Sequence, residues 1–118
     1  PALGTKAESF GSAFFYKTIM ATTYILYSQS ANRYYIGSCL NFDERLLEHK
    51  AGKYGNAYTA IAKDWKTFLV IEDLDYYQAR SIENHIKKMK SRKYIQNLII
   101  YPEIIEKLKE RFKAGSSR

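Results

Sequence analysis

The sequence predicts a small α/β (α+β) protein, in which a three-stranded, mainly antiparallel sheet is flanked by helices in a single domain. Two observations carry this prediction: three short runs rich in β-branched and aromatic residues, and apolar residues at helical spacing late in the chain. A length of 118 residues suits one domain. The apolar fraction of 46% allows a core and excludes wholesale disorder.

The first two runs are expected to form a hairpin. Residues 22–28 (TTYILYS) and 33–38 (RYYIGS) are typical strand segments, and residues 29–32 between them suit a four-residue turn. A third run, residues 66–72 (KTFLVIE), predicts a buried strand. These three strands make up the predicted sheet.

A helix is predicted directly after the hairpin. Asn41 can cap its start, Glu44 stands in the capping-box position, and the helix is expected to stop near Gly52. Three apolar side chains on it are expected to face the core: Phe42, Leu46 and Leu47.

Three further helices are expected over residues 75–90, 91–99 and 102–113, the last of them started by Pro102. The first has an apolar stripe at helical spacing. This stripe consists of Ala79, Ile82, Ile86 and Met89. The resulting order is β-β-α-β-α-α-α.

Residues 20–113 are interpreted as the folded domain. Residues 1–19, which precede Met20, are interpreted as a leader or vector-derived segment, and residues 114–118 as a flexible tail. No run of about 20 apolar residues occurs, so no membrane span is expected and the expected location is cytoplasmic. A single cysteine, Cys39, excludes a disulfide within the chain and a cysteine-based zinc cluster.

The positive charge is concentrated at one end. Residues 1–84 hold nine basic and nine acidic side chains, whereas residues 85–118 hold ten basic and three acidic ones, which accounts for the whole net charge of +7. Such a cationic end is typical of proteins that bind a polyanion such as nucleic acid. The alternative is a solvated helical face that only keeps the protein soluble.

Two features of the hairpin and the helix after it are candidates for chemistry. Tyr24 and Tyr35 stand on neighbouring strands, and Gly37 in mid-strand is typical of a place that another group approaches closely. Arg45 and His49 are spaced i, i+4 and share one helix face, where a held guanidinium suits a phosphate. Taken alone, the tyrosines are more typical of cross-strand packing, and the Arg–His pair is more typical of an ordinary surface.

Glu83 lies at the border of the apolar stripe of its helix, four residues after Ala79 and three before Ile86. A carboxylate there is partly desolvated and requires a cation. That cation is either a structural lysine or a hard divalent ion such as Mg²⁺, which takes oxygen ligands and keeps several waters.

Taken together, these residues resemble the GIY-YIG endonuclease domain over roughly residues 22–100. The first half-motif corresponds to Thr22-Thr23-Tyr24 and the second to Tyr35-Ile36-Gly37, followed by the run from Arg45 to His49 and by Glu83. The likeness is to short stand-alone bacterial members related to the N-terminal nuclease domain of the excinuclease UvrC. Two departures are the threonines in the first half-motif and Ser38-Cys39, which replace a lysine that some members carry.

The resemblance implies a metal-dependent endonuclease that hydrolyses DNA phosphodiester bonds, with DNA repair or recombination as its setting. Glu83 would hold one divalent ion, Mg²⁺ or Mn²⁺, and Arg45 would bind the non-bridging oxygens. Tyr24 or Tyr35 would take a proton from the attacking water, and His49 would orient a tyrosine or touch phosphate. A phenol with a reference pKa of about 10 must have its pKa lowered for this role.

DNA is thus the expected partner, with no small-molecule cofactor. Six residues are expected to contact nucleic acid: Gly37, Lys87, Lys88, Lys90, Arg92 and Lys93. Two alternatives stay open, a catalytically inactive nucleic-acid-binding module and a structural adaptor with no nucleic-acid role.

Overall fold

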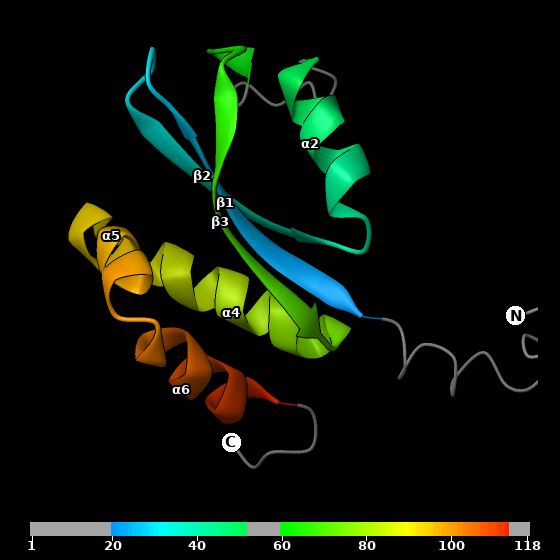
Figure 1. Cartoon of the computed structure of the whole chain (residues 1–118), viewed down its shortest axis with the longest axis vertical. Coiled ribbons are helices and arrows are strands. Elements are labelled where there is room, and N and C mark those ends of the chain that lie inside the picture. Colours follow the sequence, from blue (N-terminus) through cyan, green and yellow to red (C-terminus); the bar gives the residue numbers. More distant parts are fainter. Residues whose placement is uncertain (1–19, 52–59, 114–118) are drawn as a thin grey trace, which may run out of the picture.

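The computed structural model describes residues 20–51 and 60–113, which form three strands and four helices (Figure 1). The predicted leader (residues 1–19) and tail (residues 114–118) lie outside the described residues. In the described part of the chain, no helix is long and apolar enough to cross a membrane. The α+β architecture predicted from the sequence is confirmed.

The sheet has the strand order β2-β1-β3 and is antiparallel throughout. Strand β1 (Ala21–Ser28) pairs with β2 (Arg33–Cys39) as the predicted hairpin, and β3 (Trp65–Leu74) pairs with the other edge of β1. The central place of β1 follows from its sequence, because Ile25 and Leu26 are both fully buried, one on each side of the sheet. Strand β2 is therefore an edge strand.

One face of the sheet is covered by α2 (Phe42–Lys50) and the other by α4 (Tyr76–Met89), as Figure 1 shows. Helix α2 begins at Asn41, whose side chain accepts a hydrogen bond from the Glu44 backbone. Its apolar side chains Phe42 and Leu46 pack on the sheet.

Helix α4 begins at Asp75, which forms a capping box with Gln78, and it ends at Lys90 in the left-handed conformation. Helices α5 (Arg92–Ile100) and α6 (Glu103–Phe112) follow and pack against the same core as α4. The expected bounds of all four helices are thus correct to within about two residues.

Two side chains do not face the core as the sequence predicted. Leu47 is 68% exposed because Leu46 and His49 take the inward positions of α2. Met89 is 43% exposed because it lies in the last turn of α4, beyond the buried Ile86. Helical spacing locates a stripe, but it does not fix which flanking residue the neighbouring strand covers.

Candidate active site

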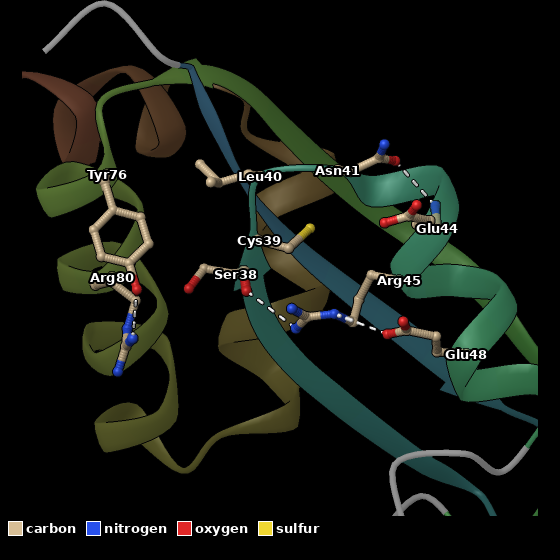
Figure 2. Close-up of a pocket in the computed structure, with 9 residues that line it drawn as sticks. All are labelled: Ser38, Cys39, Leu40, Asn41, Glu44, Arg45, Glu48, Tyr76 and Arg80. Carbon is tan, nitrogen blue, oxygen red and sulfur yellow. Dashed lines mark hydrogen bonds and ion pairs between the residues drawn. The ribbon is translucent and has the colours of Figure 1, made fainter. Parts of the chain in front are cut away.

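A cleft of about 420 Å³ lies between α2 and α4, with the end of β2 as its floor (Figure 2). Figure 2 shows Arg45 on the α2 side, Tyr76 and Arg80 on the α4 side, and Ser38 between them. The residues that line the cleft are Ser38, Cys39, Leu40, Asn41, Glu44, Arg45, Glu48, Tyr76 and Arg80. Since β2 is the edge strand, side chains from both faces of the sheet reach this cleft.

Tyr24 lies across the hairpin from Gly37, with which it is in register. A Cβ atom at position 37 would lie 2.5 Å from the Tyr24 hydroxyl oxygen and 2.7 Å from its ring carbon Cζ. Position 37 must therefore be glycine because the buried Tyr24 ring lies over it. The close approach expected at Gly37 is thus made by a tyrosine of the same protein.

His49 is fully buried beneath the sheet, with its Nε2 3.0 Å from the Tyr24 hydroxyl. The Tyr35 ring lies 4.7 Å from the imidazole and 6.4 Å from the Tyr24 ring, measured between centroids. Burial, followed by the charge of Arg45, lowers the pKa of His49, so the imidazole is neutral at neutral pH. A neutral imidazole can accept the phenolic proton.

The Tyr24 hydroxyl carries its proton at neutral pH. Burial raises the pKa of Tyr24 well above its ordinary value, and a hydrogen bond from Arg45 lowers it by less. In the protein alone the pKa of Tyr24 is thus raised, whereas the sequence predicts that Arg45 and a bound metal ion together lower it. Any proton that Tyr24 takes from water must be matched by the loss of its own, and His49 is the neighbouring acceptor.

Arg45 reaches from α2 over the edge of β2. Its Nη1 donates to the carbonyl oxygen of Ser38 at 3.4 Å, and its Nε lies 3.4 Å from the carboxylate of Glu48 (Figure 2). The side chain is 31% exposed, so the guanidinium is held and still accessible from the cleft. This is the arrangement that binding a phosphate requires.

Glu83 approaches the same strand from the opposite face of the sheet. The Ser38 hydroxyl donates to Glu83 Oε1 at 2.6 Å, and Lys87 Nζ donates to Oε2 at 2.7 Å. Arg80 Nε lies 3.6 Å from Oε1. Ser38 thus contacts Arg45 through its carbonyl oxygen and Glu83 through its hydroxyl, which places the two candidate residues on either side of one amino acid.

A family model for the GIY-YIG catalytic domain matches residues 20–96. The chain belongs to the GIY-YIG family. The match covers the hairpin, Arg45, His49 and Glu83, and it confirms the family resemblance. No curated protein and no solved structure gives a significant match. GIY-YIG domains are generally endonucleases that use divalent metal ions, and the family implies a DNA substrate.

Glu83 has the donor chemistry that a GIY-YIG metal ion needs, since its carboxylate supplies hard oxygen ligands and already balances cationic groups. Among residues 20–51 and 60–113, no group of three or more His, Cys, Asp or Glu side chains is placed to hold a metal. One protein carboxylate suits an ion that takes its other ligands from water and phosphate. Glu83 fits such an ion once the hydrogen bond from Lys87 or from Ser38 is broken, because this frees one of its carboxylate oxygens.

The basic residues near the GIY-YIG cleft have different surroundings. Lys87 forms an ion pair with Glu83. A lysine is one of the two cations predicted from the sequence beside this carboxylate, and a divalent ion is the other. Arg92 donates to the backbone and side chain of Asn32. Three further lysines expected to contact nucleic acid are exposed: Lys88, Lys90 and Lys93.

Of the nine residues that line the cleft, only Arg45 was predicted as a site residue. Four of the other eight are linked to Arg45, Glu83 or each other by side-chain hydrogen bonds or ion pairs: Ser38, Glu48, Tyr76 and Arg80. Arg80 is three residues before Glu83, so helical spacing was an available signal for Arg80. Arg80 also donates to the Tyr76 hydroxyl at 3.0 Å (Figure 2). The only sequence signal for Ser38 was its place after the second half-motif, where some family members carry a lysine, because its contacts depend on the sheet edge.

Proposed function

We propose that this GIY-YIG domain is a divalent-metal-dependent endonuclease that hydrolyses DNA phosphodiester bonds in the cleft between α2 and α4. The observation that carries the proposal is the contact of Ser38 with both Arg45 and Glu83. Through it, a cationic group suited to phosphate and a carboxylate suited to a hard metal ion lie at one place. The exposed basic residues of α4 and α5 add attraction for the polyanion.

In this proposal, Glu83 holds Mg²⁺ or Mn²⁺, which when bound supplies charge neutralisation at the phosphate and the departing 3′-oxygen. Arg45 binds the non-bridging oxygens, where negative charge accumulates in the transition state. Removal of a comparable preorganised donor typically costs about 3–4 kcal/mol. Arg80, on the opposite wall of the cleft, adds a second positive charge.

Proton transfer in this proposal uses Tyr24 and His49 together. As the O–H bond of the attacking water breaks, the Tyr24 oxygen takes that proton and passes its own proton to Nε2 of His49. The imidazole becomes imidazolium, the new hydroxide bonds to phosphorus, and the bond to the 3′-oxygen breaks. The departing 3′-oxygen takes a proton from solvent, and the imidazolium returns one to solvent, so the protons balance. Tyr35 packs against the imidazole and helps to hold it in place.

One observation favours a second candidate, the inactive nucleic-acid-binding module. Both carboxylate oxygens of Glu83 already accept hydrogen bonds, one from Ser38 and one from Lys87. If both hydrogen bonds persist when DNA and metal ions are present, Glu83 cannot bind the ion, and the protein binds DNA without cutting it.

Nicking of supercoiled plasmid separates these two functions. The proposal expects nicks with Mn²⁺ or Mg²⁺ and none with EDTA, whereas the inactive module binds DNA under both conditions and leaves the plasmid intact. Failure to nick duplex, flap and single-stranded substrates in the presence of either metal ion would contradict the proposal.

A further inference from the structure

A second hollow, of about 330 Å³, lies between the β1–β2 turn and the start of α5. Three of the residues that line it are cations: Arg33, Lys90 and Arg92. Among the described residues that line it, none is acidic. The others are Asn32, Tyr34, Ile36, Ser91 and Ile95. We refer to this hollow as the hairpin groove.

The walls of the hairpin groove are tied together by Arg92. Its Nη1 donates to the backbone oxygen of Asn32 at 3.0 Å, and its Nη2 donates to the side-chain oxygen of the same residue at 2.7 Å. The guanidinium lies 5.1 Å from the centre of the Tyr34 ring. These contacts join α5 to the turn.

The turn is also held from its other side. Asp64 accepts hydrogen bonds from the Ser28 hydroxyl at 2.6 Å and from the Ser30 backbone at 3.0 Å. The hydrogen bond from Ser28, more than any other contact, lowers the pKa of Asp64 to about 2. The groove is therefore formed before a ligand arrives, which reduces the ordering that binding requires.

Lys90 has a backbone conformation that favours glycine. It caps the end of α4 with φ = 48°, in the left-handed region where glycine is the common residue at helix ends. Folding alone would favour glycine at this position. The lysine instead adds an exposed cation to the hairpin groove, which points to a function for its charge.

The groove and the catalytic cleft lie at opposite ends of β2. Arg33 begins this strand, and Ser38 in the cleft comes five residues later. At about 3.3 Å per residue, the two positions are about 17 Å apart. Phosphates of one strand of B-DNA advance by about 3.4 Å per base pair, so this separation corresponds to about five base pairs.

We propose that the hairpin groove is a second binding site for the nucleic-acid phosphate backbone, which holds DNA about five base pairs from the bond cut in the cleft. This inference rests on the proposed nuclease function. It adds a second contact between the protein and the DNA phosphate backbone, on one side of the cut. The DNA follows the edge of β2 from the cleft to Arg33 and Lys90.

The test uses the variant Arg33→Gln/Lys90→Gly and a control, Lys66→Gln/Lys107→Gln, which removes the same charge from exposed sites outside the cleft and the groove. The cut is first mapped on a duplex, which is then shortened one base pair at a time from each end. The unmodified protein should lose affinity once fewer than about five base pairs remain on one side.

The groove variant should show no such length threshold, bind the full duplex roughly tenfold more weakly, and have a salt slope lower by about two. Lys90→Gly alone should keep or raise Tm while DNA affinity falls, which a purely structural lysine would not produce. The groove proposal alone would be overturned if the groove variant had the same length threshold and salt slope as the unmodified protein. It would also be overturned if the control variant lost as much DNA affinity as the groove variant. An unmodified protein that neither binds nor cuts DNA would overturn the nuclease function as well.

Discussion

In the described part of the chain, the core between the sheet and α4, α5 and α6 contains ten buried aliphatic residues, whereas the core on the α2 side contains five buried residues, including Tyr24 and Trp65. The α2 face also carries the fully buried His49, hydrogen-bonded to Tyr24. The α4 face is thus a continuous aliphatic core, and the α2 face is a smaller aromatic layer with a buried polar pair. This difference indicates that stability resides mainly on the α4 side, whereas the proton transfer that we propose takes place on the α2 side.

Side chains from the two faces of the sheet come together at the edge of β2. Arg45 comes from the α2 face and Glu83 from the α4 face, and both contact Ser38.

Glu83→Gln should reduce metal-dependent cleavage by about a thousandfold or more, equivalent to about 4 kcal/mol. The amide is a neutral, poorer ligand for a divalent ion, and DNA affinity should be unchanged or higher because a negative charge is lost. Single-turnover nicking and a binding titration measure the two effects. Glu72→Gln, an exposed carboxylate on β3, is the matched control and should cut normally.

Arg45→Lys should lower the single-turnover rate by about a hundredfold to a thousandfold. Lysine keeps the charge but lacks the planar fork that binds two phosphate oxygens. The same change at an exposed arginine of α6, Arg111→Lys, should leave the rate unaltered. A normal rate for Arg45→Lys would contradict the role given to the guanidinium of Arg45 in the transition state.

Ile82→Ala should destabilise the domain by about 2–5 kcal/mol, because Ile82 is fully buried in the aliphatic core. Leu46→Ala, at a half-buried position on the sheet-facing side of α2, should cost about 1 kcal/mol. Urea unfolding of both variants compares the two faces directly. Equal losses would contradict the assignment of stability to the α4 side.

Acidification should slow cleavage through His49. Its pKa is lowered by burial, so the imidazole stays neutral at neutral pH, and the rate should be flat between about pH 7 and 8. Below the lowered pKa of His49, which lies under about 6.5, the imidazole binds a proton and can no longer accept one, so the rate should fall about tenfold per pH unit. His49→Gln should be slower and should lose this dependence, as a pH–rate profile would show.

The hairpin, the third strand and all four helices were predictable because each one has local signals. Asn41 and Asp75 are residue types that commonly cap the start of a helix, and each caps one here. The β-branched and aromatic run before Ser28 is typical of a strand. The family followed from Tyr24, Tyr35, Arg45, His49 and Glu83 in this order.

The electrostatics of the site were not predictable from local signals. The raised pKa of Tyr24 results from burial beneath α2, which depends on the packing of distant segments. The buried Thr23, a departure from the family motif, donates its hydroxyl hydrogen bond to Ala79 of α4, 56 residues away. The contacts of Ser38 with Arg45 and Glu83 likewise depend on tertiary structure, because they require the edge of β2 to lie between α2 and α4.

The central claim is that Arg45 and Glu83, from opposite faces of the sheet, act in one transition state. A double-mutant cycle in single-turnover, Mn²⁺-dependent nicking tests it most directly, using Arg45→Lys, Glu83→Gln and the double variant. The account predicts that the double variant cuts about as slowly as Glu83→Gln alone, because groups that act as a unit are not additive. A normal rate in either single variant, or a loss in the double variant equal to the product of the two single losses, would contradict it.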